Sequence, residues 1–286
     1  MAEARDQLQE PAWVRWALIG AAVAIMLLVV VLPLLMLLGT AFGSGLDVWL
    51  AAVRDPHTLS ALRLTLITTA IVVPVNAVCG VFMAWALTRF EFRGKRTLLA
   101  LIDLPFAVSP VVAGLCLVLL FSPTHGFFAD LLNRYDLKIL FATPGIVLAT
   151  LFVTFPFVVR ELIPLMEQQG SDEELAARSL GANAWSMFFR VTLPNIKWGL
   201  LYGVLLCSAR AMGEFGAVTV VSGNVMGSTN TLSLHVEVLY KQLGGEGAAA
   251  FAVASLLAGL ALVTLVVKIW LEARHGDALA RSHRRH

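Results

Sequence analysis

The sequence is poor in charge and in the residue clusters that build metal or redox sites. Only 14% of its 286 residues are charged, whereas roughly a quarter are charged in an average soluble domain. The net charge of +2 is too small to indicate a nucleic-acid partner. Three cysteines and six histidines are scattered, without the spacing that metal or redox motifs require. We expect Cys79, Cys116 and Cys207, which all lie in apolar stretches, to be small buried side chains.

A nucleotide-binding motif is absent as well. No G-x-x-x-x-G-K-[ST] run occurs, and the nearest stretch, RGKRT at 93–97, lacks the earlier glycine and lies in a short basic loop. We therefore expect no ATP site in this chain, so any ATP-driven step would need another protein. We also find no nucleophile–base pair that would support a membrane-embedded enzyme.

What the sequence has in abundance is apolar residues: 58% are hydrophobic, and the mean hydropathy is +0.81. A transmembrane helix needs about 20 apolar residues. Six stretches qualify, at about 15–38, 62–88, 98–121, 139–163, 198–222 and 249–271. The first is too long for a signal-peptide core and has no convincing cleavage site, so we expect it to be retained. The sequence predicts an all-α integral membrane protein with six transmembrane helices.

The basic residues set the expected orientation. With the N-terminus inside, fifteen of the 21 Lys and Arg residues lie in cytoplasmic segments and five in outer segments. This predicts a cytoplasmic tail over 1–14, a transmembrane domain over 15–272 with a cytoplasmic loop at 164–197, and a basic cytoplasmic tail over 273–286. The outer loops are rich in turn-forming residues, and we expect most of them to be simple connectors.

The stretch SDEELAARSLGANAWSMFFRVTLPNIKWGLL, at 171–201, is charged and amphipathic although it lies between two apolar segments. Ser171 followed by Glu174 fits a capping box, in which the serine hydroxyl accepts from an early helix amide and the glutamate reaches back to the serine amide. A helix should therefore begin near Asp172. Gly181 suits the turn that ends it.

A second helix should follow at 183–193. Asn183 is a suitable cap, apolar residues recur at helical spacing from Trp185 to Thr192, and Pro194 is expected to break the helix before the next span. Two roles are open for such a pair of helices: an amphipathic hairpin that rests on lipid, or a docking surface for another protein. The acidic first helix fits lipid less well, because inner-leaflet lipids are anionic.

The part AARSLGANAWSMFFRVTLPNI resembles the cytoplasmic signature of binding-protein-dependent ABC importer permeases, which is E-A-A-x-x-x-G followed by a hydrophobic residue, x, Leu and Pro. The resemblance favours docking, and it implies a MetI-like permease fold whose coupling helices sit in a groove of an ATPase subunit. Leu175 stands where the family has glutamate, and Glu174 is one place earlier, about 100° around the helix. The implied ATPase-coupling residues are Glu173, Glu174, Leu175, Ala176, Ala177, Gly181, Ala182, Leu193 and Pro194.

An arginine and a glutamate lie inside the fifth expected span. Arg210 is about 18 Å along the helix from Trp198, and Glu214 follows at i+4, where the two can pair. Two interpretations stay open: a buried ion pair that fixes helix packing, or a polar element that lines the path or gate of a translocated anion. We include Ser109 and Pro110 in the candidate path, in a stretch whose prolines should perturb the third span.

Three stretches, ARAMGEFGAV, LPFAVSPVVAG and STNTLSLHVEVLY, narrow the resemblance to sulfate, thiosulfate and molybdate permeases, and the last resembles a CysW-type sulfate permease subunit. This implies an importer in the bacterial inner membrane, surrounded by lipid. Its other parts would be a second permease of the CysT/CysU type, two CysA-type ATPase subunits and a periplasmic sulfate- or thiosulfate-binding protein. This chain would hold no cofactor, since ATP and Mg²⁺ would bind to the ATPase subunits.

The substrate stays open among sulfate, thiosulfate and molybdate, because much of the selectivity should reside in the binding protein. A molybdate system usually contains two copies of one permease, which would distinguish it. An ion-coupled secondary transporter is a further alternative. It would depend on Asp103 and Glu214, the plausible intramembrane carboxylates, but no inverted repeat is apparent.

Overall fold

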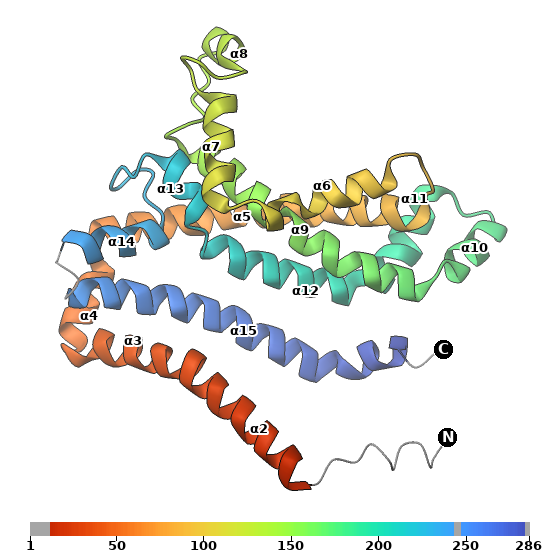
Figure 1. Ribbon diagram of the computed structural model, residues 1–286. Coiled ribbons are helices and arrows are strands. Elements are labelled where there is room, and N and C mark those ends of the chain that lie inside the picture. The colour runs from red at the N-terminus through yellow and green to blue at the C-terminus, as the bar shows by residue number, and fades with distance from the viewer. Residues whose placement is uncertain (1–11, 243–246, 284–286) are drawn as a thin grey trace.

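The computed structural model describes residues 12–242 and 247–283, and every regular element in this part of the chain is a helix (Figure 1). Residues 1–11 and 284–286 of the two expected tails lie outside the described residues. The elements are α2 Ala12–Met26, η1 Leu27–Val31, α3 Leu32–Gly43, α4 Leu46–Arg54, α5 Pro56–Arg89, α6 Lys95–Ala107, α7 Pro110–Phe121, α8 Ala129–Arg134, α9 Thr143–Gln169, α10 Asp172–Ser179, α11 Ala184–Met187, η2 Phe188–Thr192, α12 Leu193–Met212, α13 Gly216–Ser222, α14 Leu232–Gln242 and α15 Ala248–His283.

Four helical stretches in the described residues are long and apolar enough to cross a bilayer: Trp13–Gly43, Pro56–Arg89, Thr143–Gln169 and Ala248–Leu271. Two bent pairs could each add one span, which gives up to six. These are α6 with α7, bent by 110°, and Ala184–Met212 with α13, bent by 53°. The third and fifth expected spans are therefore bent rather than straight.

A proline produces the sharper bend. Ser109, just before Pro110, has an extended backbone (φ −58°, ψ 136°), and Pro110 is the first residue of α7. The proline ring disfavours helical geometry in the residue before it, and proline is well suited to the first position of a new helix. The expected perturbation of this span is thus confirmed, and it turns the chain through more than a right angle.

Helix α9 packs against both α5 and α12 in the centre of the molecule (Figure 1). Val158, Leu162 and Met166 of α9 are fully buried in this contact. Glycines bring the helices close: a Cβ at Gly80 of α5 would lie 2.7 Å from Cγ1 of Val158, and one at Gly203 of α12 would lie 3.2 Å from Cα of Val158. Small residues at such contacts are how membrane helices gain close packing.

We predict that Gly80→Ala destabilises the chain, whereas Gly259→Ala does not. Both changes gain up to about 1 kcal/mol of helix propensity, but Gly259 of α15 has no neighbour within 4 Å of an added Cβ. Overpacking of the α5–α9 contact should cost about 1–3 kcal/mol. The measurement is the thermal unfolding midpoint in detergent, where a midpoint lowered only for Gly80→Ala is expected. Equal midpoints for the two variants would contradict this account of the packing.

The expectation that all three cysteines are buried is wrong for two of them. Cys207 is buried, but Cys79 and Cys116 are exposed on this chain. A cysteine in an apolar stretch need not be buried within its own chain, because a membrane helix can turn apolar side chains toward lipid or a neighbouring subunit. The span Trp13–Gly43 is the extreme case, with none of its most apolar window buried.

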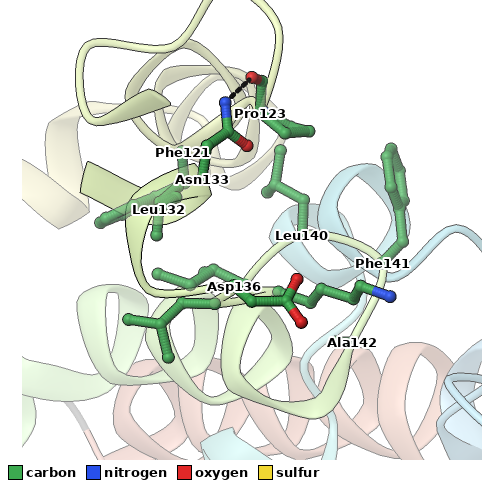
Figure 2. Close-up of a pocket in the computed structure, with 11 residues that line it drawn as sticks. Phe121, Pro123, Leu132, Asn133, Asp136, Leu140, Phe141 and Ala142 are labelled. Atoms are coloured by element: carbon green, nitrogen blue, oxygen red, sulfur yellow. Dashed lines mark hydrogen bonds between the residues drawn. The ribbon is translucent and has the colours of Figure 1, made fainter. Parts of the chain in front are cut away.

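Helix α7 packs on α13 and on α9, and α8 projects beyond its far end (Figure 1). The loop at 122–138, expected to be a simple connector, contains α8 and borders a hollow of about 380 Å³. Figure 2 shows apolar Leu132 and Leu140 beside the Asp136 carboxylate in its wall, and the Asn133 side-chain amide donates to the Pro123 carbonyl at 3.0 Å. None of the predicted site residues lines this hollow.

Candidate functional site

Helices α10 and α11 form a hairpin at one end of the molecule (Figure 1). Its local geometry follows the sequence: α10 begins at Asp172, and the Asn183 side-chain oxygen caps α11 by accepting from the Ser186 amide at 2.7 Å. Gly181 has a φ of +86°, and the amide of Ala182 bonds the carbonyl of Ala177 at 3.0 Å. This is the turn expected of a glycine that ends a helix, so these three predictions are confirmed.

The predicted capping box, by contrast, is wrong. The Ser171 side chain makes no cap hydrogen bond. Glu174 points into the protein instead: its Oε2 lies 2.7 Å from Nε of Arg89, and its Oε1 accepts from the Thr192 hydroxyl at 2.6 Å. A guanidinium is a stronger partner for a carboxylate than a single backbone amide, and it lies on a different helix.

We call Glu174, Arg89 and Thr192 the coupling clamp. Arg89 is at the end of α5, and its Nη1 also donates to the Met166 carbonyl of α9 at 3.2 Å. The side chains of Arg89 and Glu174 are 13% and 9% exposed. The clamp therefore joins the hairpin to α5 and α9 through a buried ion pair and two hydrogen bonds in which one partner is charged. Such bonds are stronger than those between neutral groups.

Four large apolar side chains are exposed on the hairpin, among charged residues such as Glu173 and Arg178. Leu175, Leu180, Trp185 and Phe189, which we call the docking patch, are each more than half exposed, and Leu180 reaches 90%. The rings of Trp185 and Phe189 stack on each other. Large apolar side chains that are exposed together in this way are typical of an interaction site.

The remaining predicted coupling residues lie around this patch. Glu173 accepts a hydrogen bond from the Asn195 side-chain amide, so it also contacts its own chain. Ala176, Gly181 and Pro194 are exposed, whereas Ala177, Ala182 and Leu193 are half-buried.

The break expected at Pro194 does not occur. The chain runs from α11 through η2 into α12, and the amide of Leu193 bonds the carbonyl of Phe188 five residues earlier. This π-helical turn lies immediately before the proline, and the shifted bonding there accommodates a residue that cannot donate. The hairpin is therefore joined to the span Ala184–Met212 without interruption.

The predicted pair of Arg210 and Glu214 forms where this long helix gives way to α13. Arg210 Nη1 lies 2.8 Å from Glu214 Oε2, with the side chains 34% and 1% exposed. Glu214 Oε1 also accepts from the amide of Ala217 at 3.0 Å, at the start of α13. The carboxylate thus joins α12 to α13 while the guanidinium keeps some exposure.

The other candidate path residues lie next to this joint. A Cβ at Gly216 would be 2.9 Å from Cβ of Pro110, so the proline bend contacts the start of α13. Ser109 is exposed beside it. These residues and the hairpin occupy separate regions of the molecule (Figure 1), which separates the candidate path from the candidate coupling site.

Comparison with known proteins identifies the family. Residues 76–275 match the model described as binding-protein-dependent transport system inner membrane component. The chain belongs to this family. It is 51% identical to the chloroplastic sulfate permease 2 of Chlamydomonas reinhardtii, over 96% of this chain and 72% of that protein. It is 48% identical to the sulfate transport system permease protein CysW of Escherichia coli K12, over 92% of this chain and 89% of that protein.

A solved structure shares the fold of this permease. A chain in the crystal structure of a bacterial alginate ABC transporter, in complex with an alginate pentasaccharide-bound periplasmic protein, superposes with a TM-score of 0.78. The match covers 92% of this chain and 94% of that chain at 18% identity. The permease therefore has the fold of an ABC transporter membrane subunit, and its resemblance to the CysW type, inferred from short motifs, is confirmed.

Sequence reasoning missed one feature of this permease. Arg160 of α9 pairs with Asp103 of α6, with Nε and Oδ1 2.7 Å apart, although the sequence placed Arg160 at the cytoplasmic side and gave it no partner. The two residues are 57 positions apart. Sequence spacing cannot predict a pair this far apart, because the two residues meet only through the packing of α6 on α9.

Proposed function

We propose that this permease imports sulfate or thiosulfate and that a separate ATPase drives it through the hairpin. The observation that carries the coupling proposal is the combination of the exposed docking patch with the buried coupling clamp beneath it. A partner that pulls on the patch would pull on α5 and α9 through Glu174 and Arg89. The relatives named for sulfate transport, at 48–51% identity, support the choice of substrate.

The complete importer in this proposal lies in the inner membrane. It consists of five polypeptides, of which the two ATPase subunits are identical. A CysT/CysU-type permease pairs with this chain, two CysA-type ATPase subunits bind ATP and Mg²⁺ and dock on the coupling helices, and a periplasmic sulfate- or thiosulfate-binding protein docks on the outer loops. The start of α2 and the end of α15 lie toward the hairpin end of the molecule (Figure 1). This supports an orientation with both termini and the hairpin in the cytoplasm.

The transport cycle would use the uninterrupted helix as its lever. ATP binding closes the ATPase dimer and moves the hairpin, and Ala184–Met212 carries this movement to the joint at Arg210 and Glu214. There the 53° bend and the neighbouring Pro110 give the path a point that can open. Hydrolysis of ATP by the partner resets the arrangement, while this chain supplies no catalytic group.

The test is reconstitution of the four kinds of subunit in liposomes, with ATP hydrolysis and uptake measured for binding protein loaded with each oxyanion. We expect sulfate- or thiosulfate-loaded binding protein to stimulate hydrolysis and uptake together. Stimulation by molybdate alone, with a complex that contains two copies of this chain, would favour a molybdate importer. Solute movement by the purified permease on a proton or sodium gradient would contradict the proposal.

A further inference from the structure

The ion pair of Arg160 and Asp103 is exposed although it lies within helices of the membrane layer. The side chains are 56% and 45% exposed, whereas the partners in the coupling clamp are almost fully covered. Arg160 is on α9 and Asp103 on α6, so the exposed face is made by both helices. The proposed function described above assigns this pair no role.

The depth of the pair follows from its position along both helices. Arg160 lies nine residues before the end of α9 at Gln169, which is about 14 Å at 1.5 Å per residue. Asp103 lies eight residues after the start of α6 at Lys95, which is about 12 Å. Basic residues gather at that end of the helices, where Arg89 bonds the carbonyl of Met166. The pair therefore lies about 12–14 Å from these ends of the two helices.

The arginine does not turn back toward the surface. A lone arginine near a membrane boundary extends its side chain to the headgroups. Here the guanidinium carbon lies 5.0 Å from the ring centre of Phe106, which is farther along α6 than Asp103, away from the Lys95 end. Phe106 in turn packs on Phe157 of α9. The charged group is thus held on the side of Asp103 that faces away from the Lys95 end of α6.

An exposed charge at this depth needs water or protein beside it. Ionised side chains inside membrane segments are costly against lipid and almost always face a bundle interior or a water-filled cavity. Within the described residues, this chain leaves the pair about half open. The face made by α6 and α9 is therefore expected to meet water or the partner permease rather than lipid, and either arrangement places it at the centre of the assembled importer.

We propose that Arg160 is an anion-binding station in the inner half of the candidate path and takes a divalent tetrahedral oxyanion. This deepens the proposed function and rests on it. Asp103 engages Nε of the guanidinium, and an arginine has five N–H donors in a planar fork, so it can hold a carboxylate and an oxyanion together. The carboxylate also limits how tightly a dianion is held, and a transport site must release its ion.

Asp103 lies four residues before the end of α6 at Ala107, which is about 6 Å along that helix. The chain then bends at Ser109 and Pro110, and Pro110 contacts the start of α13 beside the joint of Arg210 and Glu214. Arg160 and Arg210 are thus two arginines of the membrane helices that each have a carboxylate partner.

The test compares two variants that both break the pair, Arg160→Gln and Asp103→Asn, in the reconstituted importer. Loss of the cation should lower oxyanion uptake about tenfold or more, because a charge-assisted bond to the ion is lost. Hydrolysis stimulated by loaded binding protein should remain. Asp103→Asn keeps the cation but removes the carboxylate that competes for it, so this variant should hold the oxyanion more tightly and should lose less uptake than Arg160→Gln. Arg160→Lys should also retain more uptake than Arg160→Gln, because it keeps the positive charge.

Two results would contradict the proposal that Arg160 binds the oxyanion. Wild-type uptake in Arg160→Gln would show that the cation is not used, and equal loss in Arg160→Gln and Asp103→Asn would show that the pair only holds α6 on α9. Failure of the proposed function is a separate result, since wild-type complex would then show no oxyanion uptake in the same assay.

A second measurement tests the aqueous face without any substrate. In a chain whose three cysteines are replaced by alanine, Asp103→Cys should react with a charged, membrane-impermeant thiol reagent in the assembled complex. Leu28→Cys, in the apolar middle of the first span, is the matched control and should stay unreactive. A cysteine at 103 that reacts no faster than the control would place this face against lipid and remove the proposal.

Discussion

Replacing Glu174 by alanine should leave the chain inserted in the membrane and remove most of its coupling to ATP hydrolysis. The change deletes the carboxylate that holds Arg89 and Thr192. Removing one partner of a buried ion pair costs about 3–5 kcal/mol, because the other charge stays buried without compensation. The hairpin would lose its link to α5, so movement at the docking patch would no longer reach that helix. We expect uptake to fall at least tenfold, which corresponds to about 1.4 kcal/mol of lost coupling.

The measurements are co-purification of the ATPase, hydrolysis stimulated by loaded binding protein, and uptake. Glu173→Ala is the matched control, since this neighbouring glutamate makes an exposed contact with Asn195. Exposed contacts contribute little, so Glu173→Ala should retain nearly full uptake. If Glu174→Ala also transports like wild type, the coupling clamp has no role in transmission.

A double variant separates stability from transmission. Arg89→Met combined with Glu174→Leu replaces the buried charges by apolar groups, which is often neutral for stability or even stabilising. We expect this variant to unfold at a temperature near that of wild type. Its uptake should nevertheless stay low, because apolar contact does not hold the hairpin in one orientation as directed bonds do.

The features that the sequence predicted correctly are local ones. The cap at Asn183, the turn at Gly181 and the i+4 pair of Arg210 and Glu214 each involve residues within one or two helical turns. The bend at Pro110 depends on one proline and its neighbour. Short-range geometry of this kind is fixed by covalent structure and helix periodicity, so sequence spacing is enough to predict it.

The errors arise where a distant partner competes with a local one. Glu174 fits a capping box by spacing, but Arg89, 85 positions earlier in the chain, takes its carboxylate. Arg160 lacks any local partner, and its pairing with Asp103 exists only because α6 packs on α9. The prediction that Pro194 breaks the helix was wrong because the preceding π-helical turn accommodates a proline, which lacks a backbone N–H donor.

These corrections fit the proposed coupling of the hairpin to the membrane helices. A break at Pro194 would have isolated the hairpin from the next span, but the observed helix continues from Ala184 to Met212. It ends at the joint of Arg210 and Glu214, and the coupling clamp ties its other end to α5 and α9. A stiff element held at one end and jointed at the other is the arrangement that domain movements require.

The second large effect is expected from Gly181→Leu, which should prevent the ATPase from docking. Gly181 has a φ of +86°, and no neighbour lies within 4 Å of an added Cβ. An added Cβ would therefore meet no clash within this chain, and the substituted residue would be next in sequence to Leu180 of the docking patch. A left-handed conformation costs a non-glycine residue about 1–2 kcal/mol, so the turn between α10 and α11 would also distort. We expect co-purified ATPase to fall about tenfold or more, because that loss corresponds to only about 1.4 kcal/mol of docking energy.

Backbone strain and loss of docking are separated by Gly94→Leu. Gly94 has a φ of +96°, and an added Cβ there also has no neighbour within 4 Å, yet it lies outside the hairpin, before α6. The two variants should therefore carry similar strain, and their yields in the membrane should be similar. If docking is what Gly181 serves, only Gly181→Leu loses the ATPase and its stimulated hydrolysis. An equal loss in both variants would assign the effect to strain, and full assembly with Gly181→Leu would place the ATPase contact away from this turn.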